Sequence, residues 1–368
     1  MMADGVRPDG AGTPWYALCG PDNDVVVSCR VRLARNLANF PFPGRFRGDD
    51  ALRVQALVFD ALSKQQERAF RMMPSEQLSP EHRRILEERG VLKRRHNSDG
   101  LPETGVAVDF AGASSCLVNC VDHIRIAGFA AGMQFPDVFD GCRIVDSFLQ
   151  ESLQIAASPE FGFLTACFRD AGSGMKLSAM VHIPAVCRAG AFRALADSLR
   201  QNGCAVVPAF PLPGNRHAGA FFIVQTAAAM AGSEVDQIAA VEASCRRIMD
   251  EERKISAGFA DTKSTVVCNA VIRAYSIAKF SMLVSMAEAV DIISDLKLAL
   301  RLNMLSGISD SDFCGLLYRI QPGHLAYIEE CGSFSFEADV GRNPALRVDR
   351  LRAVTLQEAF EKITLGNV

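Results

Sequence analysis

The chain has 368 residues, of which 49% are hydrophobic and 22% are charged, and its net charge is −3. A chain of this length can bury the cores of two domains, and its small negative charge argues against a general nucleic-acid binder. No apolar run reaches the ~20 residues that cross a bilayer, and the first residues lack the apolar core of a secretion signal, so we expect a cytoplasmic protein with no membrane contact and with its twelve cysteines reduced.

The first predicted elements are a flexible lead-in, a strand and two helices. Residues 1–24 are rich in Gly, Pro and Asp, which is typical of a loose terminal segment. The β-branched run from Val25 to Val27 predicts the start of a buried strand. Apolar residues at helical spacing predict a helix over 50–72. Ser79 followed by a proline predicts the cap and first turn of a second helix.

Between residues 105 and 225 the pattern changes to short β-prone segments separated by helical stretches. The predicted strands cover 106–110, 115–118, 123–127, 161–168, 178–183 and 221–225. The predicted helices cover 136–157 and 184–202. Many strands with helices to one side indicate an α+β sheet domain, which we place at residues 25–254.

From residue 233 onward the pattern is helical. Predicted helices cover 233–254, 266–275, 281–290 and 292–302. Residues 255–368 are therefore expected to form a separate, mostly helical C-terminal domain. Cys116 and Cys120 would share one face of a strand, but no second cysteine pair or nearby histidine cluster completes a zinc site. We expect no bound metal.

The most informative stretch is the strand that begins at Val25, because it carries three arginines within six residues. Arg30 and Arg32 share one face of an extended chain, and Arg35 follows just beyond. Three guanidinium groups so close together repel one another. They must face solvent, pair with distant carboxylates, or bind an anion such as a polyphosphate, whose oxygens suit the planar guanidinium group. The spacing leaves these alternatives open.

Two further segments carry candidate chemistry. His123 and Arg125 share a strand face, which fits either a buried structural pair or a binding site. Further on, Gly172 and Gly174 form a glycine-rich turn with Lys176 just beyond it. The turn could let backbone N–H groups approach a phosphate, or it could be an ordinary hairpin turn. Cys167, which precedes it, is either a reactive thiol or a core residue.

Together these segments resemble the ATP:guanido phosphotransferase family, with bacterial protein arginine kinases as its most similar branch. Ser28-Cys29-Arg30-Val31-Arg32 matches the N-terminal signature, whose residues contact ATP phosphates. The segment around Asp122 matches a second motif, and the segment from Cys167 onward matches a third. The resemblance implies that ATP is bound by Ser28, Arg30, Val31, Arg32, His123, Arg125, Gly172, Gly174, Lys176, Ser178 and Met180.

The catalytic part of the pattern differs from the family. Val121 and Pro213 stand at the positions of the two glutamates that orient the substrate guanidinium and accept its proton. Pro208 replaces an ATP-binding arginine, and Gly90 replaces a histidine that touches ATP. A guanidinium group is a poor nucleophile while it is protonated. The resemblance therefore leaves Cys167, Asp170 and Asp122 as the catalytic candidates.

A fifth motif lies near the C-terminus. Asp349 and Arg352 resemble the Arg-Asp-x-x-Arg-Ala motif that forms a phosphoarginine-binding regulatory pocket in protein arginine kinases. Val348 stands at the position of the leading arginine, and Arg347 lies one residue before it. The charged face of an amphipathic helix is the alternative.

The resemblance implies a phosphagen-kinase-like antiparallel sheet flanked by helices, followed by a helical C-terminal domain that mediates homodimerisation. It also implies Mg-ATP as cofactor, a protein partner that carries arginine or phosphoarginine, and a Clp protease pathway. Two hypotheses remain. The chain is an active kinase of protein arginine, or it is a degenerate member that binds nucleotide or phosphoarginine and acts through regulation. The joint loss of both glutamates favours the second hypothesis.

Overall fold

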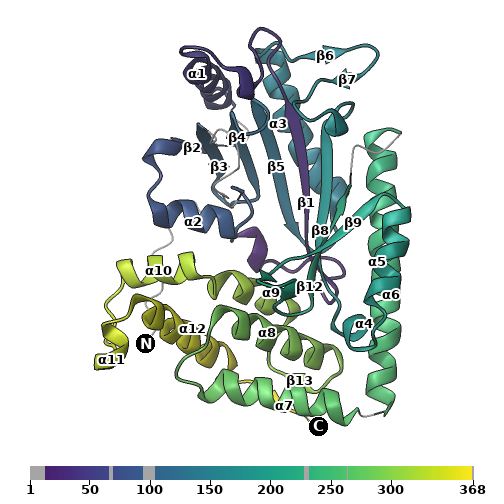
Figure 1. Cartoon of the computed structure of the whole chain (residues 1–368), viewed down its shortest axis with the longest axis vertical. Helices are drawn as coiled ribbons and strands as arrows, with labels where there is room; N and C mark the ends of the chain where they lie inside the picture. Colours follow the sequence, from purple (N-terminus) through teal and green to yellow (C-terminus); the bar gives the residue numbers. More distant parts are fainter. Residues whose placement is uncertain (1–12, 66–68, 94–103, 228–231, 263, 367–368) are drawn as a thin grey trace.

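A large antiparallel sheet forms the centre of the computed structural model, which describes residues 13–65, 69–93, 104–227, 232–262 and 264–366 (Figure 1). Its eight strands lie in the order β2-β3-β4-β5-β1-β8-β12-β9, and all neighbouring pairs are antiparallel. The strands are β1 (Val26–Arg35), β2 (Phe70–Pro74), β3 (Gly105–Asp109), β4 (Ser114–Val118), β5 (Ile124–Ala131), β8 (Met175–His182), β9 (Cys204–Pro208) and β12 (Phe221–Thr226). Within these described ranges there are also three two-stranded ribbons: β6 (Ala157–Ser158) with β7 (Gly162–Phe163), β10 (Pro211–Leu212) with β11 (Arg216–His217), and β13 (Leu305–Ser306) with β14 (Thr364–Leu365).

Helices cover one face of this sheet and bury its apolar side chains. They are α1 (Asp50–Ser63), α3 (Phe135–Ser152), α4 (Pro184–Arg188), α5 (Phe192–Gln201) and α6 (Glu234–Thr262). Alternate residues of the central strand, such as Val31 and Leu33, point into this core, where they join Phe135 and Leu149 of α3. The helix α2 (Pro80–Glu88) lies apart from this layer and packs on the C-terminal helix α10 (Pro322–Cys331) (Figure 1).

The C-terminal helices form a second core below the sheet in Figure 1. They are α7 (Thr265–Phe280), α8 (Met286–Arg301), α9 (Asp310–Arg319), α10 (Pro322–Cys331), α11 (Ala338–Gly341) and α12 (Pro344–Phe360). The sheet with its flanking helices and the helical C-terminal part confirm the predicted α+β fold class. Within the described ranges, no helix combines the length and apolar character needed to cross a membrane.

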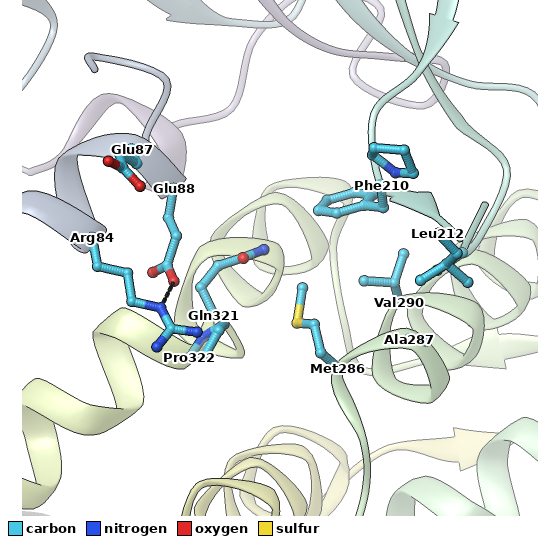
Figure 2. Close-up of a pocket in the computed structure, with 12 residues that line it drawn as sticks. Arg84, Glu87, Glu88, Phe210, Leu212, Met286, Ala287, Val290, Gln321 and Pro322 are labelled. Atoms are coloured by element: carbon cyan, nitrogen blue, oxygen red, sulfur yellow. Dashed lines mark ion pairs between the residues drawn. The ribbon is translucent and has the colours of Figure 1, made fainter. Parts of the chain in front are cut away.

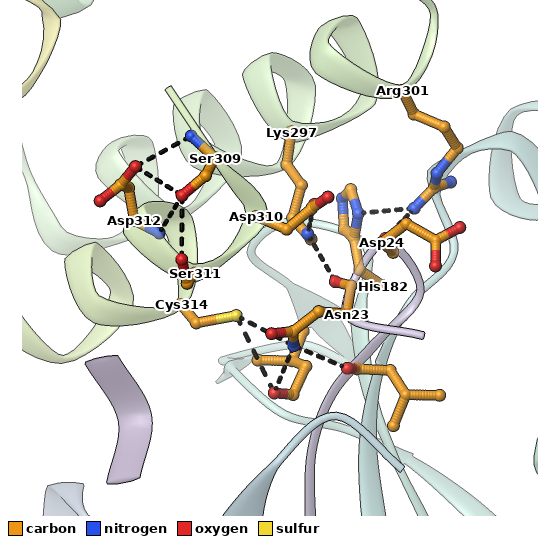
Figure 3. Close-up of polar contacts among 12 residues, drawn as sticks. Asn23, Asp24, His182, Lys297, Arg301, Ser309, Asp310, Ser311, Asp312 and Cys314 are labelled. Atoms are coloured by element: carbon orange, nitrogen blue, oxygen red, sulfur yellow. Dashed lines mark hydrogen bonds and ion pairs between the residues drawn. The ribbon is translucent and has the colours of Figure 1, made fainter. Parts of the chain in front are cut away.

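A network of buried polar contacts joins the C-terminal helices to the sheet (Figure 3). The ammonium group of Lys297 donates to the carbonyl oxygen of Asn23 at 2.8 Å and pairs with Asp310. Arg301 pairs with Glu252 of α6 at 2.5 Å. Because these charges are buried, each depends on its partner, and removing one partner from such a pair costs about 3–5 kcal/mol.

His182, at the end of β8, is part of the same network. Its ring stacks on Phe221 and lies 3.1 Å from the hydroxyl of Ser294 on α8. Burial, together with the nearby charges of Arg301 and Lys297, holds the pKa of His182 well below its usual range. This histidine is therefore neutral in the folded protein.

Several predicted elements differ from the structure. The helix predicted over 50–72 ends at Ser63, because Phe70 and the residues after it pair with β3 instead. The strand predicted over 161–168 is reduced to the two residues of β7, and a 3-10 turn follows at Phe168–Asp170. The two helices predicted over 281–302 are the single helix α8.

The predicted domain limits also fall at different features. Of the predicted lead-in, residues 1–12 lie outside the described residues, and the rest contains Trp15, whose ring is buried and stacks on Phe129. The limit predicted at residue 254 lies inside α6, which continues to Thr262.

Candidate functional site

The face of the sheet opposite the α3–α6 layer gathers basic side chains from three neighbouring strands. Arg32 of β1 lies directly opposite Lys176 of β8, and Arg30 lies opposite Ser178. On the other side of β1, Ala34 lies opposite Arg125 of β5. Directly opposed residues of antiparallel strands point to the same side of a sheet. The residues that share this face, which we call the basic face, are Ser28, Arg30, Arg32, Arg125, Lys176, Ser178 and Met180.

The positive charges of the basic face are only partly compensated. Arg30 donates to Ser178 Oγ at 3.3 Å and to the carbonyl oxygen of Gly90 at 3.1 Å. The Nε atom of Arg32 is buried without a hydrogen-bond partner. Within the described residues, no hydrogen bond or ion pair holds the guanidinium group of Arg125.

Electrostatics and burial act together on these arginines. Burial and the charge of Arg125 lower the pKa of Arg30 to about 10. Burial, together with the charges of Arg30 and Arg125, also lowers the pKa of Arg32 well below its usual value. Both shifts show that the charged forms are held at a cost, which a bound anion would offset.

One carboxylate enters the basic face. Asp170 belongs to the 3-10 turn Phe168–Asp170, and its carboxylate pairs with Lys176 at 2.9 Å. It also acts against the pKa depression of Arg32, so it lies close enough to stabilise that charge. The Asp170 N–H donates to the carbonyl oxygen of Cys167 at 2.9 Å, which links the carboxylate to the candidate thiol through one short turn.

Asp122 is hydrogen-bonded within the fold. Its carboxylate is buried and accepts from Asn36 Nδ2 and from the backbone N–H of Ala166, both at 2.7 Å. The carboxylate therefore fixes the chain just before Cys167. Both bonds are accepted by Oδ1 and position the turn, and the catalytic role of Asp122 stays a prediction.

The glycine-rich segment has one strict steric requirement. Gly174 has a φ of +63°, and a Cβ atom there would lie 2.6 Å from the carbonyl oxygen of Ala34. Gly172 has a φ of +107° in open space. Only glycine adopts these conformations without strain, and Gly174 also allows β8 to begin beside β1.

Two predicted ATP-binding side chains do not reach the basic face. The side chain of Val31 points into the core on the opposite face of the sheet. His123 is fully buried, where its Nδ1 accepts from the N–H of Leu37 and its Nε2 donates to the carbonyl oxygen of Pro41. Burial lowers its pKa, so His123 is a neutral structural residue. The prediction that the side chains of Val31 and His123 bind ATP is therefore corrected, because neither side chain lies on the basic face.

Arg35 does not lie on the basic face with Arg30 and Arg32. It points to the core side and forms a bidentate pair with Asp146 of α3, at 2.7 and 2.9 Å. Of the alternatives open for the three arginines, Arg35 therefore pairs with a distant carboxylate.

The positions of the two replaced glutamates carry no acid: Val121 is 54% exposed on the loop before β5, and Pro213 lies at the turn between β10 and β11.

A cavity of about 300 Å³ lies beside Met180, at the end of the basic face nearest the C-terminal helices. Its walls include Pro208, Phe210, Tyr318 and Gln321. It shares Glu87, Phe210 and Gln321 with a second cavity of about 330 Å³, which Figure 2 shows between α2, α8 and the start of α10. Sequence reasoning missed these cavities, because their walls come from segments far apart in the chain.

The predicted phosphoarginine pocket is closed by internal bonds. The guanidinium group of Arg352 is 1% exposed and donates to the carbonyl oxygens of Ile320 and Val284 and to Asp349. Arg347 pairs with Glu329 of α10. In this conformation the motif connects α12 to its neighbours, so the three side chains offer no open anion site.

Two family models match the chain. "ATP:guanido phosphotransferase, C-terminal catalytic domain" matches residues 53–255. "Protein-arginine kinase McsB C-terminal domain" matches residues 264–365.

Curated relatives carry the name protein-arginine kinase. The protein from Halothermothrix orenii is 27% identical over 328 residues, which cover 89% of this chain and 93% of the relative. The protein from Syntrophomonas wolfei is 28% identical over 306 residues, which cover 82% of this chain and 85% of the relative.

Solved structures with the same fold include a lombricine kinase and the duplicated taurocyamine kinase of Schistosoma mansoni. The first has a TM-score of 0.56 at 17% identity and covers 67% of this chain and 73% of its own. The second has a TM-score of 0.56 at 18% identity and covers 75% of this chain and 38% of its own. The predicted phosphagen-kinase-like fold is thus confirmed.

Proposed function

Because the chain belongs to the ATP:guanido phosphotransferase family, we propose that its basic face binds the phosphates of Mg-ATP and that the protein acts mainly by binding, as a regulatory relative of the protein-arginine kinases. The family resemblance drawn from the motifs is confirmed. The observation that carries the proposal is the convergence of Arg30, Arg32, Arg125 and Lys176 on one face.

The fit of this face to a polyphosphate rests on its unpartnered donors. The buried Nε of Arg32 needs an acceptor, and an acceptor that also carries negative charge stabilises the arginines around it. Phosphate oxygens meet both requirements. Arg32 and Lys176 would hold one end of the phosphate chain, and Arg30 would hold a phosphate further along β1. Bound ATP would supply the phosphoryl group for any transfer.

Loss of efficient transfer follows from the side chains at the catalytic positions. Val121 and Pro213 cannot accept a proton or orient a guanidinium group. Loss of a general base costs about 10²–10⁴ in rate. The carboxylate of Asp170 is engaged by Lys176, which leaves it a weak substitute for a free base.

An active kinase of protein arginine is the second candidate. It is favoured by the position of Asp170 in the turn that follows Cys167, where a carboxylate enters the basic face. In this case Asp170 would orient the acceptor guanidinium and take its proton. The partner in either case is a protein that carries arginine or phosphoarginine, with Clp protease components as candidates and a homodimer as the expected assembly.

Two measurements test the proposal. ATP binding is measured by calorimetry for the wild type and for Arg125→Gln. Arg143→Gln is the matched control, because Arg143 is exposed on α3 and, among the residues that the structure describes, pairs with Asp140. We expect Arg125→Gln to weaken binding at least tenfold and the control to have no effect. Equal binding by all three proteins would contradict the proposal.

Transfer is measured with γ-labelled ATP and an arginine-rich protein, scored as acid-labile label. We expect no label above background. Label that disappears in Asp170→Ala and Cys167→Ser would instead establish the active kinase.

A further inference from the structure

The side chain of Asp170 attaches its turn to the basic face through one ion pair, while backbone hydrogen bonds fix the turn at its two ends, at Ala166 and at Gly172. The backbone bonds of residues 168–171 stay within the turn, where Asp170 N–H donates to Cys167 and Ala171 N–H donates to Phe168. Phe168 is 82% exposed, so its ring does not anchor the turn in a core. Among the described residues, Lys176 is the ion-pair partner of Asp170. A group that replaces Asp170 at Lys176 would therefore free the residues between these fixed ends, 168–171.

The position of this carboxylate is one that a bound phosphate would need. Lys176 and Arg32 are directly opposed on neighbouring strands, so the carboxylate on Lys176 also faces Arg32. A phosphate bound by both cations would occupy the same place. Asp170 and a phosphate therefore compete for one end of the basic face.

Further along β1, Arg30 forms no hydrogen bond or ion pair with Asp170 in the described part of the chain. Arg30 lies two residues, or about 6.6 Å of strand, from Arg32, and its guanidinium group is held at Ser178 and Gly90. Its hydrogen bonds go to neutral oxygens, Ser178 Oγ and the Gly90 carbonyl, so its charge has no anionic partner there. A ligand with several linked phosphates can place one group at Lys176 and Arg32 and another at Arg30.

We infer that Asp170 is a built-in counter-ion that makes the basic face select polyphosphates over single phosphoryl groups. The inference rests on the proposed phosphate-binding function and narrows it. A single phosphoryl group exchanges one anion for another at Lys176 and Arg32, so it gains little. A polyphosphate makes the same exchange and also neutralises Arg30, so its binding displaces Asp170 and releases the turn.

The test compares two inorganic probes, orthophosphate and tripolyphosphate, on the full chain. Calorimetry gives the affinity of each probe for the wild type, Asp170→Asn and Glu160→Gln. Glu160 is an exposed acid of the β6–β7 ribbon, so its variant removes the same charge at a distance from the basic face. We expect the wild type and Glu160→Gln to prefer tripolyphosphate strongly. Asp170→Asn should gain about tenfold in orthophosphate affinity, which lowers the preference by a similar factor.

Hydrogen exchange of residues 168–171 gives a second readout. Tripolyphosphate should speed exchange in the wild type, because the turn is released. Slower or unchanged exchange in the bound protein would overturn the inference.

The outcomes separate this inference from the proposed function. If tripolyphosphate binds, and Arg32→Gln abolishes that binding, but Asp170→Asn leaves the preference unchanged, the proposed function stands and the role of Asp170 is wrong. If neither the wild type nor Asp170→Asn binds tripolyphosphate, both are wrong.

Discussion

The basic face and the C-terminal arginine motif look alike in the sequence and differ in the structure. Both contain arginines at short intervals. In the C-terminal motif, Arg347 and Arg352 each have an acidic partner as well as backbone acceptors. On the basic face, Arg32 has a buried donor without a hydrogen-bond partner. An arginine whose partners lie within the fold contributes stability, and one without them is available to a ligand.

Replacement of Arg352 should give the largest effect. Arg352→Ala leaves two buried carbonyl oxygens and Asp349 without their donor, so we expect a loss of about 3–5 kcal/mol in the free energy of unfolding. Urea denaturation measures it. Arg350→Ala on the same helix is the control, because its pair with Glu337 is partly exposed and should cost less than about 1 kcal/mol. Similar losses in both variants would remove the distinction between the two regions.

Replacement of Arg32 should weaken ATP binding without lowering the stability of the protein. Arg32→Gln removes a desolvated charge that two other arginines repel, so the free energy of unfolding should stay the same or rise. ATP affinity should fall about 10- to 100-fold, as expected for loss of a charge-assisted hydrogen bond. Calorimetry and urea denaturation on one preparation measure both quantities. A loss of stability with unchanged affinity would place Arg32 with the structural arginines.

The junction between the two regions should respond to acid. The pKa of His182 is depressed in the folded protein, whereas in the unfolded chain it is near 6.5. Unfolding therefore takes up a proton below about pH 6.5, and stability falls with decreasing pH by up to about 1.4 kcal/mol per unit. The buried His123 adds to this trend.

His182→Gln separates the two contributions. The variant should show a smaller slope than the wild type in urea denaturation at pH 5–6.5. An identical slope in His182→Gln would show that the junction does not sense acid.

The smallest expected effect concerns Lys176. Lys176→Arg offers a planar fork to phosphate in place of a point charge. Since Asp170 also binds the new group more firmly, the two effects oppose each other. We expect a gain in ATP affinity of about threefold in the wild-type background. The gain should be larger when Asp170→Asn is added. A smaller gain in the double variant would argue against competition between Asp170 and the ligand.

Much of the basic face was predictable, because it depends on local patterns. The alternation of a strand placed Arg30 and Arg32 on one side and Val31 on the other. The family motifs located Arg125 and Lys176, although nothing in their spacing shows that they meet Arg32. The strand β2 was missed because its partner, β3, begins 35 residues after it starts.

The roles of the acids were not predictable from spacing. Asp122 and Asp170 appeared as equivalent catalytic candidates, and the structure gives them different partners. Asp122 bonds to Asn36, which is 86 positions earlier in the chain. Likewise, Arg35 leaves the arginine group because Asp146 lies 111 positions away. Such pairings depend on how α3 and the loops pack on the sheet.

The buried network between α8 and the sheet has a consequence for dissecting the protein. A fragment that starts at residue 255 would cut α6 and leave Lys297 and Arg301 without Asn23 and Glu252. Two buried cations would then face solvent beside exposed apolar surface. We expect such a fragment to be poorly folded, and the intact chain to melt in one cooperative transition. We therefore expect the two units recognisable in the sequence to fold together.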